Sequence, residues 1–120
     1  MMRQRTGMTG RLCMAALAAA LVAGAPGLAG AQDAKKGEQV YEAQKCSVCH
    51  SIAGKGSKTN PLDGVGSKLS AADTKQWIVE PIEMAKKVSS QKKPPMPKKY
   101  DKLPAADVDA LVAYMQSLKK

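Results

Sequence analysis

The most restrictive feature of this chain is the stretch KCSVCH at positions 45–50. It holds two of the three cysteines, Cys46 and Cys49, together with the only histidine, His50. Two thiols this close in sequence can form a disulfide, contribute to a metal site, or bond covalently to a cofactor. Which of these three uses applies determines the kind of fold that we expect from the rest of the chain.

A disulfide and a zinc site both fit this sequence poorly. A Cys-x-x-Cys redox pair is normally found near a βαβ pattern, and no segment here alternates as a strand does. A structural disulfide between residues three apart closes a very short loop and constrains the unfolded chain little. Structural zinc sites use four ligands, usually in two separated pairs. After position 31, however, the only Cys and His residues are Cys46, Cys49 and His50.

The pattern Cys-x-x-Cys-His is the signature of covalent attachment of c-type haem. The two-residue spacer allows one helical turn to present both sulfurs, Cys46 and Cys49, to the two vinyl groups of a haem. His50 follows the second thioether directly, which places it to bind the iron as the proximal ligand. The sequence therefore predicts one covalently bound haem c.

The N-terminal residues have the pattern of a secretory signal peptide. Arginines at positions 3, 5 and 11 precede an unbroken apolar run over residues 12–23, and the small residues Ala29-Gly30-Ala31 follow. This order of basic, apolar and A-x-A segments predicts cleavage after Ala31. The apolar run is shorter than the roughly 20 residues of a membrane span. We therefore expect a signal peptide over residues 1–31, which also removes Cys13, and a mature chain over residues 32–120 in the periplasm.

The mature chain is one small, basic domain. Domains this short often depend on a disulfide, metal or cofactor for stability, and here phenylalanine is absent. The predicted signal contains all three arginines, which leaves 16 lysines against 10 acidic residues, a net charge of +6. That balance favours acidic partners through long-range attraction. Nucleic acid is a poor fit, because export removes the chain from it and no arginine is left for base contacts.

Periodicity and breaker residues predict an all-α fold. Asp33 can cap a helix over residues 34–45, and Ser70 and Asp73 resemble a capping box at the start of a helix that stops before Pro81. Residues 82–88 can form a further short helix, while residues 51–67 and the proline-rich residues 93–97 are expected to be irregular. Pro104 suits the first position of a final helix whose apolar stripe runs from Val108 to Leu118.

The sixth ligand of the iron is predicted from the methionines. Because His50 is the only histidine, that position must go to methionine, lysine, a terminal amine, water or an external ligand. Met115 belongs to the stripe of the last helix, where core packing is the usual explanation, and Met84 suits either core or surface. Met96 is instead an isolated thioether between prolines in a lysine-rich loop. Proline stiffening would hold its sulfur in place, so we predict Met96 as the distal ligand.

Taken together, these features resemble the class I, monohaem c-type cytochromes over residues 32–120. The resemblance is carried by Gly37 and Tyr41, the CSVCH segment at residues 46–50, LDGVG at residues 62–66, Met96-Pro97, and LVAY at residues 111–114. It implies three to four helices around the haem, with Gly37 at the contact between the first and last helices. It also implies a proline whose carbonyl accepts the Nδ1 hydrogen of the histidine, for which Pro61 is the candidate. Trp77 is a candidate for a haem propionate contact or for a plain core role.

The expected function is one-electron transport through a haem with His50 and Met96 as axial ligands, and not enzymatic catalysis. The alternative is a haem peroxidase or a gas-binding haem protein with an open distal site, for which the second histidine and the arginine of the usual distal apparatus are missing. Six lysines near Met96 are candidates for a docking site for acidic redox partners or for an ordinary solvated face. We expect a monomer with no membrane span in the mature chain. The six lysines are Lys86, Lys87, Lys92, Lys93, Lys98 and Lys99.

Overall fold

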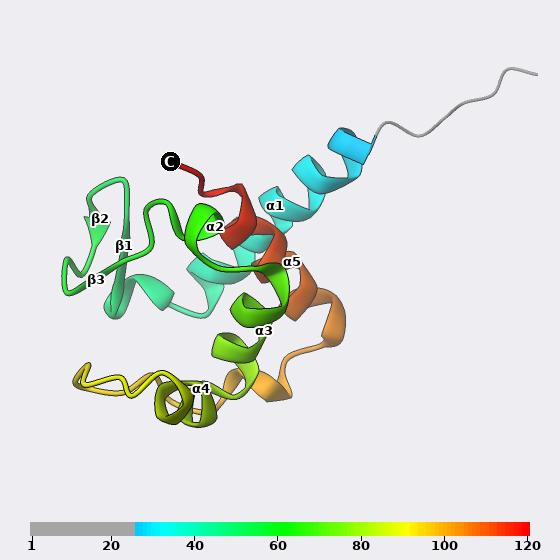
Figure 1. Ribbon diagram of the computed structural model, residues 1–120. Helices are drawn as coiled ribbons and strands as arrows, with labels where there is room; N and C mark the ends of the chain where they lie inside the picture. The colour runs from blue at the N-terminus through cyan, green and yellow to red at the C-terminus, as the bar shows by residue number, and fades with distance from the viewer. Residues whose placement is uncertain (1–25) are drawn as a thin grey trace, which may run out of the picture.

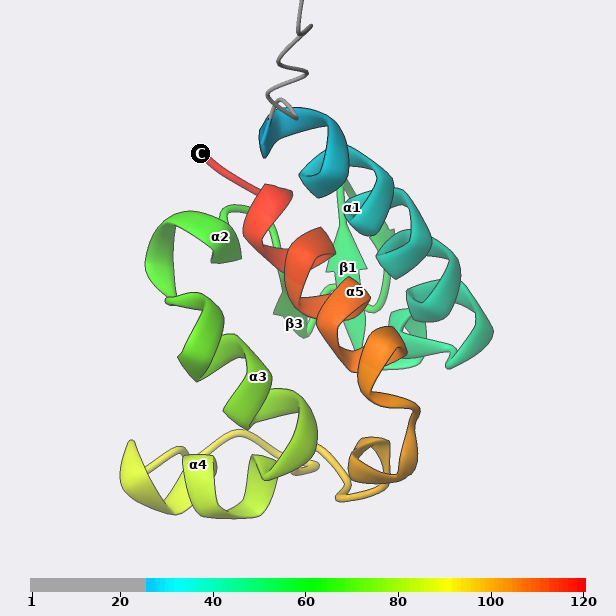
Figure 2. The ribbon, with the colours of Figure 1, turned by 90° about the vertical axis from the view of Figure 1, so that its right-hand side faces the viewer.

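The computed structural model describes the backbone of residues 26–120 and the side chains from Gln32 onward. The predicted signal peptide, Cys13 included, lies mostly outside the described residues. Two helices form the frame of the fold, α1 (Pro26–Ala43) and α5 (Ala105–Ser117). They pack against each other, crossing in the view of Figure 1 and lying next to each other in Figure 2. Between them in sequence lie α2 (Val65–Lys68), α3 (Ala71–Val79) and α4 (Pro81–Lys87).

Helices α1 and α5 approach closely because Gly37 has no side chain. Gly37 is buried, and a Cβ built at this position would overlap the main-chain carbonyl oxygen of Ala110. Tyr41, one turn further along α1, packs edge-on against Tyr114 of α5 with ring centroids 5.7 Å apart. The expected contact of Gly37 between the first and last helices is therefore confirmed. The core cluster continues from this contact and consists of Tyr41, Ile78, Tyr100, Val108, Leu111 and Met115.

The start of α3 follows the capping signal in the sequence. Ser70 has extended backbone geometry, and its Oγ accepts a hydrogen bond of 3.1 Å from the Asp73 amide. The helix ends at Val79, before the buried Pro81, which occupies the first turn of α4. Residues 93–97 form no regular element, as expected, and a 3₁₀ turn, η2 (Tyr100–Lys102), leads on to α5.

A small three-stranded sheet corrects the expectation of an all-α chain. The strands β1 (His50–Ile52), β2 (Lys55–Gly56) and β3 (Asn60–Pro61) are arranged in the order β2-β1-β3, with β2 antiparallel and β3 parallel to β1. Strands of two or three residues are too short to produce the alternation that identifies a strand in sequence. The sheet begins at His50, and the rest of it lies within residues 51–67, which were predicted to be irregular.

The number and limits of the helices also differ from the prediction. Residues 26–120 contain five α-helices instead of three or four, because the four-residue α2 forms before α3. The first helix begins at Pro26, before the expected cap at Asp33, and it ends at Ala43. The last helix begins at Ala105, with Pro104 as its N-cap residue. None of the helices within residues 26–120 combines the length and hydropathy needed to cross a membrane.

Candidate haem-binding site

The attachment segment follows α1 through a sharp turn. Lys45 adopts a left-handed backbone conformation with φ of 56°, and Cys46–Val48 then form the 3₁₀ turn η1. The amide of Cys49 donates a hydrogen bond of 3.2 Å to the carbonyl of Cys46, which keeps the two cysteines on one compact turn. Both thiols are free, with Cys46 half-buried and Cys49 exposed.

His50 is held by a hydrogen bond from its ring. Its Nδ1 lies 3.0 Å from the main-chain carbonyl oxygen of Asn60, and the two residues are paired in the parallel register of β1 and β3. Because a carbonyl only accepts, Nδ1 carries the proton and Nε2 keeps a free lone pair for a metal. A backbone acceptor at the second nitrogen is the usual way in which a ligating histidine is oriented.

This hydrogen bond corrects the role expected for Pro61. The acceptor is the carbonyl of Asn60, whereas Pro61 is paired in register with Ser51. The acceptor is thus the residue directly before the expected one. Because any residue has a main-chain carbonyl, the side chain of Asn60 gave no signal for this role in the sequence.

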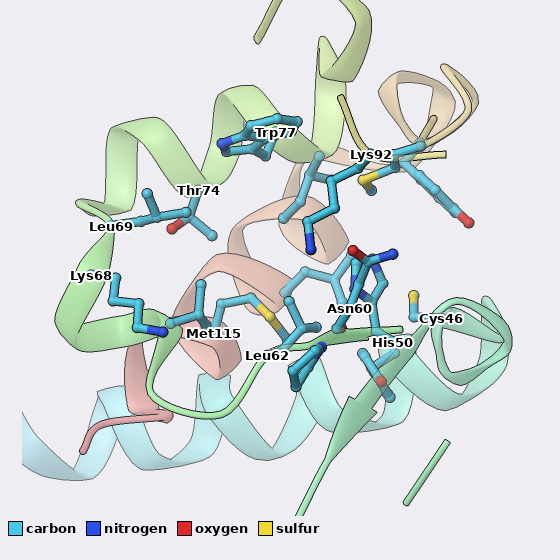
Figure 3. A pocket seen from close by; sticks show the side chains of 17 residues that line it. Cys46, His50, Asn60, Leu62, Lys68, Leu69, Thr74, Trp77, Lys92 and Met115 are labelled. Atoms are coloured by element: carbon cyan, nitrogen blue, oxygen red, sulfur yellow. The ribbon is translucent and has the colours of Figure 1, made fainter. Parts of the chain in front are cut away.

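A cavity of about 560 Å³ opens beside the attachment segment (Figure 3). Its size falls within the range of roughly 300–1,000 Å³ that is usual for ligand and cofactor sites. Cys46, His50 and Met96 line it together, with Trp77 and Met115 on other walls. The remaining lining residues are predominantly apolar or aromatic: Tyr41, Asn60, Pro61, Leu62, Val65, Lys68, Leu69, Thr74, Ile78, Lys92, Tyr100 and Leu111.

A second hollow of about 540 Å³ shares part of these walls. Cys46, His50 and Met96 line both hollows, and Cys49 lines the second one. The prolines on either side of Met96 belong to the second hollow as well. The four residues that the sequence singled out, Cys46, Cys49, His50 and Met96, are thus gathered around one continuous set of walls.

The three methionines differ in their relation to this cavity. Met84 is buried, with 6% of its surface exposed, and it lines neither hollow. Met115 is equally buried and lines the first hollow from α5, within the core cluster. Met96 is half-buried, packs against that cluster, and lines both hollows from the proline-rich loop.

One buried polar atom on the cavity wall has no partner. The hydroxyl oxygen of Tyr41 is buried and makes no hydrogen bond with any residue that the structure describes. Burial, together with smaller effects of the neighbouring Cys46, Tyr114 and Asp63, raises the pKa of Tyr41 to about 12. An apolar cavity next to a free histidine nitrogen, two thiols and an unpartnered hydroxyl fits a large, mostly apolar cofactor that can also interact with polar groups.

Cys46 lacks the environment of a reactive thiol. Burial raises the pKa of the Cys46 thiol above its ordinary value, despite a lowering effect of its backbone hydrogen bond and of Lys99. Redox-active cysteines usually have a lowered pKa, because the thiolate is the reactive form. Within residues 26–120, no group of three or more His, Cys, Asp or Glu residues could hold a metal ion. Neither a redox-active pair nor a zinc site therefore gains support.

Sequence reasoning did not place Lys68 or the Asn60 side chain at the site, and it included Lys92 only in the group of six lysines near Met96. Lys92 and Lys68 carry their ammonium groups toward the cavity, and the Asn60 side chain lies between Lys92 and His50 in Figure 3. No periodic pattern marks such positions, because Lys92 lies in a loop, Lys68 ends the four-residue α2 and Asn60 belongs to the two-residue β3. Their proximity to His50 depends on how the loops fold over the cavity.

A comparison with protein families matches residues 34–119 to the Cytochrome c family. The match covers most of the chain, and the chain belongs to the cytochrome c family. Members of this family bind covalent haem c and carry electrons, and Cys46, Cys49 and His50 fit the family's attachment motif. Searches of curated proteins and of solved structures gave no match to this chain.

Proposed function

We propose that the mature chain is a periplasmic carrier of single electrons, with the haem held by Cys46, Cys49, His50 and Met96. The observation that carries this proposal is that Cys46, His50 and Met96 line one largely apolar cavity of about 560 Å³. Cys49, on the same turn as Cys46, lines the adjoining hollow. Bound haem supplies an iron that alternates between the ferrous and ferric states.

The two cysteines attach the cofactor through thioether bonds. Cys46 is half-buried and lines both hollows, whereas Cys49 is exposed and lines the second one, so the attachment segment is reachable from the surface. Covalent attachment suits an exported protein, because a cofactor lost outside the cytoplasm is difficult to replace. The exposed side of the segment gives a short route for electrons to a docked partner.

His50 and Met96 would bind the haem iron. His50 donates from Nδ1 to the Asn60 carbonyl, which leaves Nε2 to bind iron and makes the ring a stronger electron donor. Met96 comes from a loop in which Pro94, Pro95 and Pro97 restrict the backbone. Methionine as the second ligand raises the reduction potential relative to a nitrogen donor.

The cavity walls exclude water and hold the ligands in place during electron transfer. Leu62, Val65, Ile78, Leu111 and Met115 supply apolar surface from three different parts of the chain. An environment that changes little between oxidation states lowers the reorganisation required of the protein. This arrangement favours electron transfer over ligand turnover, and we propose no enzymatic activity.

Three of the six lysines near Met96 are placed to attract acidic partners. Lys86 pairs with Glu83 at 3.1 Å and Lys98 pairs with Glu80 at 3.3 Å, so these two charges are partly neutralised. Lys92, Lys93 and Lys99 form no ion pair within residues 32–120, and all three line the second hollow beside Cys49 and Met96. We propose that these three lysines surround the electron-transfer surface of a monomer and steer an acidic redox partner to it.

A redox titration combined with ligand addition tests the proposed function. The protein should titrate reversibly as a one-electron couple, and the ferric form should leave cyanide and azide unbound at millimolar concentrations. A ferric form that binds either anion rapidly, with a large spectral change, would instead indicate the open distal site of a peroxidase or a gas-binding protein.

A further inference from the structure

We propose that Gly56 is a positioning residue for the haem-attachment segment. The absence of a side chain at Gly56 allows β2 to lie directly against the backbone of Ser47 and His50. This contact sets the direction in which His50 presents its ring to the cavity. The inference rests on the proposed function, in which His50 is an axial ligand of the haem iron.

The contact at Gly56 leaves no room for a methyl group. A Cβ built on Gly56 would overlap the carbonyl oxygen of His50, and it would lie 2.9 Å from the carbonyl oxygen of Ser47. The next residue, Ser57, donates its amide hydrogen to that Ser47 carbonyl at a distance of 2.9 Å. The backbone at residues 56 and 57 therefore contacts the attachment segment both between the cysteines and at the histidine.

Gly56 and Asn60 act on His50 from opposite sides. In the sheet order β2-β1-β3, the strand that begins at His50 lies between the strand that contains Gly56 and the strand that contains Asn60. A side chain at Gly56 would push the backbone of His50 toward β3. The hydrogen bond from Nδ1 to the Asn60 carbonyl would then lose its alignment, because such bonds weaken steeply with angle.

Met96 comes from a different part of the chain than His50, so a change in the position of His50 would alter how the two residues bind the haem iron together. Met96 belongs to the proline-rich loop before η2, which is not part of this sheet. A displaced His50 would therefore change the position of its ring relative to the Met96 side chain, and the methionine would not follow. We expect binding of the haem iron by Met96 to weaken as a result.

Gly54 provides a matched control for Gly56. Both glycines have positive φ, 79° at Gly54 and 102° at Gly56, so a substitution at either position strains the backbone. A Cβ on Gly54, however, would meet no atom within 4 Å. The two positions therefore share the backbone strain and differ in the contact with the attachment segment.

The experiment compares Gly56→Ala and Gly54→Ala as haem-bearing proteins made in a host with cytochrome maturation. We expect both variants to unfold at lower denaturant concentration than the parent. Only Gly56→Ala should also show a lower reduction potential and a weaker far-red band of ferric methionine ligation. A Gly56→Ala protein that keeps the potential and the far-red band of Gly54→Ala would overturn the proposal, whatever its stability.

A second variant covers the case in which Gly56→Ala acquires no haem. Ser57→Pro removes the N–H that is donated to the Ser47 carbonyl, the other contact between these two segments. It should shift the potential and the far-red band in the same direction as expected for Gly56→Ala, and unchanged values would count against the proposal. A parent protein that contains no haem would instead refute the proposed function, so the two failures can be distinguished.

Discussion

Gly37 of α1 lies directly against the main-chain carbonyl of Ala110 of α5. A Cβ at position 37 would overlap that carbonyl oxygen and would lie 2.6 Å from the Cβ of Tyr114. Tyr41 and Leu111, which both line the haem cavity, flank this contact on the same two helices. The close approach of the two helices therefore sets the position of one wall of the cavity.

Gly37→Ala should destabilise the protein although alanine favours helix. In an exposed helix the substitution would stabilise by about 1 kcal/mol, but here the added methyl group has no space. Overpacking of this kind costs typically about 1–3 kcal/mol. Denaturant unfolding of the haem-bearing protein measures the change, with the exposed Gln39→Ala on the same helix as the control. Equal stability of Gly37→Ala and the parent would show that the helices can separate without loss.

Met96→Ala should remove the sixth ligand without unfolding the protein. We expect loss of the far-red band in the ferric spectrum and a fall in reduction potential, because methionine ligation raises the potential. Met84→Leu is the matched control, since Met84 is buried but lines neither hollow. It should keep both the band and the potential. An unchanged spectrum in Met96→Ala would exclude Met96 as the ligand.

Tyr41→Phe should change how stability depends on alkaline pH. Burial raises the pKa of Tyr41 from 10.0 to about 12, so between these values the unfolded chain loses the proton while the folded chain keeps it. The contribution of Tyr41 to stability is fully present below pH 10 and is lost as the pH rises toward 12.

Urea unfolding of the ferrous, haem-bearing protein at several pH values measures this loss of stability. The fall in the free energy of unfolding between pH 10 and 12 should be smaller in Tyr41→Phe than in the parent, because the lysines contribute equally to both. At neutral pH the variant should be at least as stable, since it removes a hydroxyl without a partner. Parallel pH curves would mean that Tyr41 ionises normally in the folded protein.

Charge reversal at the second hollow should slow electron transfer to anions. We expect the double variant Lys93→Glu/Lys99→Glu to transfer electrons to ferricyanide more slowly than the parent. Its rate should also fall less steeply than the parent's as salt is added. Lys35→Glu/Lys58→Glu makes the same change in net charge with exposed lysines that line neither hollow. Stopped-flow rates at several ionic strengths compare the two double variants. If both slow the reaction equally, the net charge and not the position of the lysines is responsible.

The helices and the attachment residues could be predicted from local sequence signals. Ser70 and Asp73 predicted the start of α3, and the apolar stripe from Val108 to Leu118 predicted the last helix. Both signals depend only on residues that are close in sequence. The CSVCH segment was recognised in the same way. The contact of Gly37 between the first and last helices was predicted from the resemblance to the c-type cytochromes, and the structure confirms it.

The features missed by sequence reasoning depend on distant backbone contacts. The strands at residues 50–52, 55–56 and 60–61 are too short to show a period, and they pair through main-chain groups that any residue possesses. The acceptor for His50 is likewise a carbonyl, so the identity of Asn60 gave little indication of it. The side chains of Lys68 and Lys92 reach the cavity only because separate loops bring them there.

The most direct test of the account is the mass of the purified mature protein, measured together with its visible spectrum in both oxidation states. We expect the mass of residues 32–120 plus one haem, resistant to acid–acetone extraction, and the sharp reduced bands of a c-type haem. A colourless product with the mass of the bare polypeptide, made in a host that attaches haem to other proteins, would contradict the account.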